Sequence, residues 1–203
     1  MFEKPILLNV VRKMNQSQKA LLFDKIEKEA RDNEILYWGC SQAVLGALQR
    51  YIELGNCEAF KAASALAGGV GKAREVCGAL LGGVLAIGLA YGRDKFENGK
   101  NAQEQPAYLE AMLRSARLCE RFKETFGNLR CSDVKVFVRG DDYKNYTRFN
   151  TLESLQDHDK CADVTGPAAR LAVEVMLDST KLYIPEIQSQ MADIRRVRSL
   201  QGN

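Results

Sequence analysis

The sequence contains a single histidine, His158, which limits the catalytic chemistry open to the chain. Cys–His and Ser–His nucleophile pairs both need an imidazole base, so any such pair has to use this residue. His158 lies three residues before Cys161, close enough for both to line one site, but a surface histidine in a polar turn is the more ordinary interpretation. Histidine-dependent hydrolysis is therefore poorly supported, and the role of His158 stays open.

The sequence also lacks an excess of charge of one sign. Its 29 Lys and Arg residues and 26 Asp and Glu residues give a net charge of +3. A nucleic-acid footprint needs a larger basic face than this charge provides. The cluster Arg195-Arg196-Val197-Arg198 is short and lies near the C-terminus, where a solvated helix end explains it. We expect no nucleic-acid partner.

Long hydrophobic runs are absent. The longest, Val76 to Tyr91, has 16 residues and reaches about 24 Å as a helix, less than the roughly 30 Å core of a bilayer. The apolar stretch from Pro5 to Val11 follows Glu3 and has no small-residue cleavage site after it, unlike a secretory signal. We therefore predict a cytoplasmic protein without a membrane-inserted helix.

A nucleotide-binding loop is absent as well. The segment Gly68-Gly69-Val70-Gly71-Lys72 has the glycines of a P-loop but not their spacing. That motif needs a glycine five residues before its Gly-Lys pair and Ser or Thr after the lysine, where this chain has Leu66 and Ala73. Nucleotide binding is not expected.

The chain does have six cysteines, without a single CxxC pair. This spacing excludes a zinc ribbon and a thioredoxin motif. Because the cytoplasm keeps thiols reduced, catalytic, redox or metal-binding roles are favoured over a static disulfide framework. Cys119 falls on the apolar stripe of its expected helix and should pack in the core. Cys57 lies near the same face as Phe60 and is also interpreted as structural.

The other four cysteines each follow a break in the chain and open an expected helix: Cys40, Cys77, Cys131 and Cys161. The first turn of a helix carries unpaired N–H groups and partial positive charge, which should lower the pKa of a thiol there. A helical bundle can bring such positions together at one end. We predict that these cysteines share one site, with at least three sulfurs within about 7 Å.

Apolar residues recur at helical spacing over most of the chain, which predicts an all-α fold, a single-domain helical bundle. The expected helices are Ser17–Leu36, Cys40–Leu54, Cys57–Ala67, Val76–Tyr91, Pro106–Phe126, Cys161–Leu182 and one after Pro185. Within residues 1–203 we distinguish an N-terminal helical extension (1–36), a cysteine-motif core (37–182) and a C-terminal helix (183–203).

Four details of this organisation are also expected. In the first helix, Leu21 joins Leu22, Ile26 and Ala30 on the apolar face. Cys131 opens a short segment in which valines alternate with charged or aromatic residues. Residues 139–157 form a long loop or lid between Cys131 and Cys161, and Gly166-Pro167 kinks or restarts the helix that follows.

The helix expected over Val76–Tyr91 contains several interior glycines, each of which costs roughly 1 kcal/mol relative to alanine. Gly78 and Gly82 are one turn apart and present one bare strip of backbone beside Cys77. Two explanations stay open for this strip. Either a neighbouring helix packs closely against it, or Gly78 and Gly82 leave room for a cofactor.

These motifs resemble the C_GCAxxG_C_C family of redox-active proteins, named for its cysteine pattern. The resemblance rests on Gly39-Cys40-Ser41-Gln42-Ala43-Val44, on Cys77-Gly78-Ala79-Leu80-Leu81-Gly82, on Phe126-Gly127 followed by Cys131, and on Cys161. It covers Gly39 to about Leu177, most of the chain. Cys57 and Cys119 have no counterpart in the pattern. The resemblance implies redox activity but supplies no substrate, metal or reaction.

The leading hypothesis is a cytoplasmic redox-active or metal-binding protein that uses Cys40, Cys77, Cys131 and Cys161. Two of these thiols could exchange a reversible disulfide with a redox protein partner. All four could instead ligate zinc or an iron–sulfur cluster. The alternative is a non-enzymatic helical interaction protein with structural cysteines, whose C-terminal helix binds a partner or a second copy to form a homodimer. These possibilities, and whether the protein is an enzyme, stay open at the level of sequence.

Overall fold

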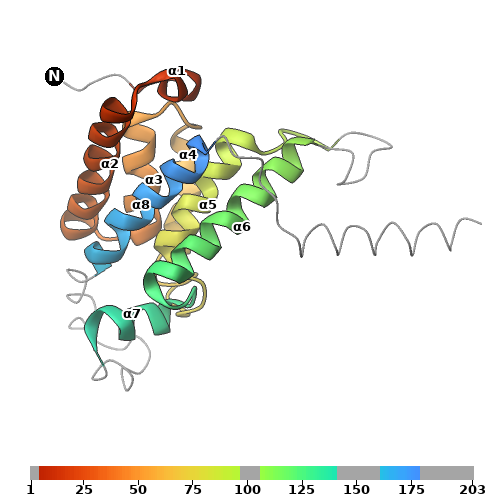
Figure 1. Cartoon of the computed structure of the whole chain (residues 1–203). Coiled ribbons are helices and arrows are strands. Elements are labelled where there is room, and N and C mark those ends of the chain that lie inside the picture. The colour runs from red at the N-terminus through yellow and green to blue at the C-terminus, as the bar shows by residue number, and fades with distance from the viewer. Residues whose placement is uncertain (1–4, 97–105, 141–160, 179–203) are drawn as a thin grey trace, which may run out of the picture.

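The computed structural model describes residues 5–96, 106–140 and 161–178 (Figure 1). These residues form eight α-helices and one short 3-10 helix, without a β-strand among them. In chain order the elements are α1 (Leu8–Lys13), α2 (Gln16–Tyr37), α3 (Cys40–Tyr51), α4 (Cys57–Ala62), η1 (Ala63–Leu66), α5 (Gly78–Tyr91), α6 (Pro106–Phe126), α7 (Cys131–Arg139) and α8 (Ala162–Leu177). The predicted all-α, single-domain fold is confirmed.

Two buried helices organise the bundle. Helix α8 packs against α2, α3, α5 and α6, and α5 also packs against α3 and α6. Helix α5 is apolar around most of its circumference, so it buries residues on several sides, including Leu80, Ala86 and Ile87. Figure 1 shows α7 at one end of the bundle, next to the chain that leads into α5. That end holds the candidate site described below.

Helix α2 begins where its sequence favours a cap. Asn15 and Gln18 form a capping box, in which each side chain accepts a hydrogen bond from the other residue's backbone N–H. Ile26 and Ala30 are fully buried. The expectation for Leu21 was wrong, because this side chain is 60% exposed and lies beside the apolar stripe. The structure instead buries Glu34, two turns after Ile26 on the same face.

Two further segments differ from the expected elements. The segment with alternating valines forms helix α7, in which Val134 is buried and Val136 and Val138 are half-buried. Helix α8 continues through Pro167 and does not restart there. Gly166 lies close to α2, since a Cβ atom there would be 3.1 Å from the carbonyl oxygen of Glu27.

Several expectations lie outside the described residues. They concern His158, nearly all of the loop at 139–157, the Arg195–Arg198 cluster and the C-terminal helix of residues 183–203. Among the helices that the structure does describe, none combines the length and apolar character needed to cross a membrane.

Candidate functional site: a cavity lined by four thiols

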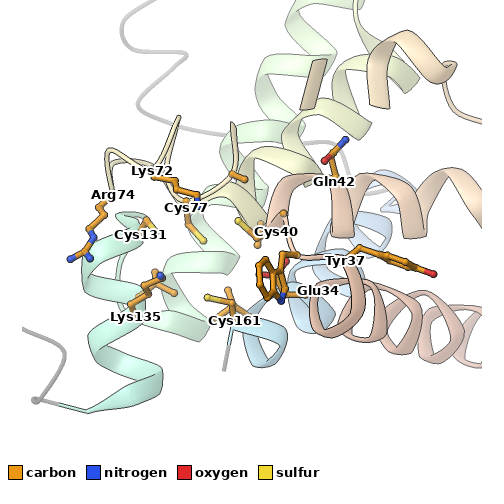
Figure 2. A pocket seen from close by; sticks show the side chains of 17 residues that line it. Glu34, Tyr37, Cys40, Gln42, Lys72, Arg74, Cys77, Cys131, Lys135 and Cys161 are labelled. Atoms are coloured by element: carbon orange, nitrogen blue, oxygen red, sulfur yellow. The ribbon is translucent and has the colours of Figure 1, made fainter. Parts of the chain in front are cut away.

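The structure brings all four predicted cysteines to one cavity of about 240 Å³ (Figure 2). Cys40 and Cys131 are the first residues of α3 and α7, and Cys77 and Cys161 are the N-cap residues of α5 and α8. Each thiol therefore stands at the start of a different helix, and the four helix starts converge at one end of the bundle. All four cysteines are free thiols.

Cys40 is positioned by a sharp turn between α2 and α3. Trp38 and Gly39 have φ angles of 61° and 90°, both in the left-handed region, which is unfavourable for a residue as bulky as tryptophan. Ser41 then fixes the start of α3, because its buried hydroxyl donates a hydrogen bond to the carbonyl oxygen of Ala63 at 2.7 Å. The turn reverses the chain and brings Cys40 to the wall of the cavity.

Cys77 and Cys131 are held near each other by backbone pairing. Val76 and Arg130 form an isolated antiparallel bridge. The N–H of Cys77 donates to the carbonyl of Leu129 at 2.8 Å, and the N–H of Cys131 donates to the carbonyl of Glu75. Helices α5 and α7 thus begin side by side, although 54 residues separate their cysteines in the sequence.

The glycine strip of α5 is covered by α3. A Cβ atom on Gly78 would be 2.5 Å from the Sγ of Cys40, and one on Gly82 would be 2.5 Å from the carbonyl oxygen of Ser41. Both distances are too short for a real Cβ atom. The strip therefore serves close helix packing and makes room for the Cys40 sulfur beside Cys77. We do not propose Gly78 or Gly82 as cofactor contacts.

The thiol pKa values run opposite to the expectation from helix termini. Burial raises the pKa of Cys77 to about 12 and that of Cys161 to about 11. Burial also raises the pKa of Cys40 well above its usual value, and that of Cys131 above its usual value. Burial destabilises the thiolate more than the positive end of each helix stabilises it. The prediction of lowered thiol pKa values was therefore wrong.

Cys77 illustrates how these effects compete. Its burial is the largest influence, and the neighbouring thiol of Cys131 raises its pKa further. The backbone N–H groups of Ala79 and Leu80 lower it, as the helix start predicts, but by less. Cys77 also interacts with Cys40 and Cys161, so its charge state depends on all three other cavity thiols.

Charged residues that the sequence analysis did not single out complete the cavity. Lys135 and Arg74 lower the pKa of Cys131, although burial outweighs them. Glu34 is 1% exposed and raises the pKa of Cys40 and Cys161, in each case less than burial does. The sequence contained one signal for Glu34. This residue follows Ile26 and Ala30 at the same four-residue spacing, so it places a carboxylate on the face of α2 that is otherwise apolar.

The remaining two cysteines lie elsewhere. Cys119 is half-buried on α6 and packs against the core. Cys57 is exposed at the start of α4, and its Sγ lies 3.9 Å from Oε1 of Glu58. The interpretation of Cys57 as a packed structural residue was therefore wrong, because helix α4 has no buried residues.

The described residues contain no group of three or more His, Cys, Asp or Glu side chains arranged to hold a metal ion. The four thiols therefore line the cavity without forming a ready ligand set in this conformation. Tetrahedral thiolate sites need all ligands at about 2.3 Å from the metal, so metal binding here requires rearrangement.

The raised pKa values predict slow alkylation of the cavity. At pH 8, iodoacetamide should modify Cys77 about 100-fold or more slowly in the folded protein than in urea, because the folded thiol is almost wholly protonated. The rate in the folded protein should rise about tenfold per pH unit from pH 8 to pH 10, still below a pKa of about 12. Mass spectrometry of timed samples measures this, with exposed Cys57 as the internal reference. Equal rates in folded and unfolded protein would contradict it.

Comparison with known proteins adds one finding. A family model described as "Putative redox-active protein (C_GCAxxG_C_C)" matches residues 38–175, more than half of the chain. The matched span includes all four cavity cysteines. Neither the curated proteins nor the solved structures contain a significant match to this chain.

Proposed function

The chain belongs to the C_GCAxxG_C_C family of redox-active proteins, and we propose that its cavity carries out thiol–disulfide exchange in a reducing compartment such as the cytoplasm. The observation that carries this proposal is the convergence of four free thiols from four helix starts on one cavity. Structural cysteines have no reason to gather in this way, because each could pack alone as a small hydrophobe. The proposal needs neither a bound metal nor a second copy of the chain.

We assign the exchanging pair to Cys131 and Cys77. Cys131 faces the cations Lys135 and Arg74, which favour its thiolate against the effect of burial. Cys77 is the next thiol along the cavity and is tied to Cys131 by the backbone bridge. In the exchange, Cys131 attacks a disulfide substrate to form a mixed disulfide, and Cys77 then attacks Cys131 to release the second product thiol.

The environment also favours one direction of electron flow. A dithiol pair becomes a strong oxidant when its reduced form is stabilised. Here burial disfavours every cavity thiolate, whereas a disulfide is neutral and suits a buried site. The protein is therefore proposed as an electron donor, with a reduction potential more negative than about −200 mV.

The test is a redox titration of anaerobically purified protein in thiol–disulfide buffers, with the disulfides mapped by mass spectrometry. We expect a two-electron transition below about −200 mV and a Cys77–Cys131 disulfide in the oxidised form. A Cys40–Cys77 disulfide would show that Cys40, and not Cys131, is the partner of Cys77. That pairing is also within reach, because the Cys40 sulfur lies against Gly78, next to Cys77. A disulfide that omits Cys77, or none at all, would contradict the proposal.

Elemental analysis of the same sample separates redox exchange from metal ligation. Stoichiometric zinc or iron that blocks alkylation of Cys40, Cys77, Cys131 and Cys161 until a chelator removes it would favour the thiolate-ligand mechanism instead.

A further inference from the structure

We infer that the cationic wall of this cavity, formed by Lys72, Arg74 and Lys135, binds the anionic group of a small carboxylate-bearing disulfide. Such a low-molecular-weight disulfide, rather than a protein, is then the substrate. This inference rests on the proposed function, and it adds the size and charge of the molecule that enters the cavity.

The charges of the lining residues are unequal. Three cationic side chains line the cavity, and Glu34 is the one acidic residue among the described residues that do so. Figure 2 shows Lys72, Arg74 and Lys135 on the side of Cys131, and Glu34 on the side of Cys40. An anion that enters on the Cys131 side therefore meets positive charge next to the thiol proposed to attack.

The loop that supplies two of these cations has an unusual backbone. Residues 68–72 all have positive φ angles, from 55° to 73°, and Arg74 follows at 63°. Three of these positions, Val70, Lys72 and Arg74, are not glycine, and left-handed backbone is unfavourable for each of them. Such strain persists where the surrounding structure imposes it, and it is concentrated at ligand clamps and active sites. Lys72 and Arg74, two of these left-handed positions, both line the cavity.

The cations also lie close enough to affect one another. Burial lowers the pKa of Lys72, and the charge of Lys135 lowers it further. Lys72 belongs to the loop and Lys135 to α7, so two separate elements bring like charges to the same wall. A bound carboxylate reduces this repulsion and gains the attraction of both ammonium groups.

Size argues for a small substrate. The cavity of about 240 Å³ is smaller than the roughly 300–1,000 Å³ typical of pockets for drug-sized ligands. Cys77 and Cys131 are only 6% and 4% exposed. Exchange requires direct contact between the attacking sulfur and the disulfide, so a disulfide fixed on a protein surface does not reach these atoms. A small molecule that enters the cavity does.

The reaction balances with two protein thiols and one small disulfide. The Cys131 thiolate attacks one substrate sulfur, which breaks the substrate S–S bond, forms a mixed disulfide and releases one small thiolate that takes up a proton. Cys77 then attacks the Cys131 sulfur, which releases the second small thiol and leaves a Cys77–Cys131 disulfide. Two electrons and the two thiol protons pass from the protein to the two product thiols.

The test compares three disulfides of similar size and different charge, each added to the reduced full-length protein. They are 3,3′-dithiodipropionate (anionic), bis(2-hydroxyethyl) disulfide (neutral) and cystamine (cationic). At low salt the anionic disulfide should oxidise the protein at least about tenfold faster than the cationic one, and the ratio should fall as salt screens the charges. Quenched-flow alkylation followed by mass spectrometry measures the loss of free Cys77 and Cys131.

Variants assign the preference to the wall. Lys72→Gln and Lys135→Gln should each reduce the anionic-to-cationic rate ratio by about threefold or more, whereas Lys13→Gln, on the exposed surface of α1, should leave it unchanged. The ratio is the readout because Lys135 also affects the thiol pKa, which changes all three rates together. Circular dichroism shows that each variant folds.

The possible results separate the two ideas. Oxidation by all three disulfides at similar rates, or fastest by cystamine, overturns the inference and leaves thiol exchange intact. Reduction of a protein disulfide without reaction of the small ones also overturns the inference. If none of these oxidants forms a cavity disulfide, the proposed function itself fails.

Discussion

Gly82→Ala should lower the free energy of unfolding by about 1–3 kcal/mol, although alanine is the better helix former. A Cβ atom at Gly82 would lie 2.5 Å from the carbonyl oxygen of Ser41 and 3.0 Å from the Cβ of Val44. The first of these is a backbone atom in the start of α3, which cannot move aside without shifting that helix and Cys40 with it. The expected decrease in Tm is about 2–4 °C per kcal/mol for a chain of this size.

Gly88→Ala is the matched control for this prediction. Gly88 lies in the same helix α5, and a Cβ atom there would meet nothing within 4 Å. The same chemical change should therefore stabilise the protein by up to about 1 kcal/mol through helix propensity. Urea unfolding of both variants measures the difference. If both substitutions stabilise the fold, α3 does not press against the strip, and the CGAxxG spacing has no packing requirement at Gly82.

Cys77→Ser should abolish formation of the cavity disulfide and slow the release of the second product thiol by about 100-fold or more. Without the resolving thiol, Cys131 should remain as a mixed disulfide with the substrate. The side chain changes only from a thiol to a hydroxyl, so Tm should stay within a few degrees of wild type. Any decrease comes from burying the more polar hydroxyl, and each kcal/mol of destabilisation lowers Tm by about 2–4 °C. Intact-mass spectrometry detects the trapped adduct directly.

Cys119→Ser is the control for this change, because Cys119 is half-buried on α6 and does not line the cavity. It should exchange like wild type. Wild-type rates in Cys77→Ser, or an adduct on Cys119 rather than on Cys131, would show that the reactive pair had been assigned wrongly.

Local sequence signals determined much of the fold. Pro106 suits the first helical turn, and Gly127 adopts a φ of 76° at the other end, so the bounds of α6 agree with those predicted. The sequence also predicted that four cysteines open helices, because glycines and polar residues mark the breaks before them: Cys40, Cys77, Cys131 and Cys161. These features depend on residues within a few positions of one another.

The tertiary structure decided what local signals do not contain. The expected low pKa of Cys77 was wrong because burial, which is set by α3, α7 and α8 together, outweighs its own helix start. Leu21 is exposed and Glu34 is buried because neighbouring helices, not the α2 sequence alone, determine which face is covered. The convergence of four thiols, and of Lys72 with Lys135, depends on the packing of elements far apart in the chain. Spacing along the sequence therefore identified the four cysteines that line the cavity, whereas only the folded bundle added Glu34 and the three cations and set the electrostatic environment of the thiols.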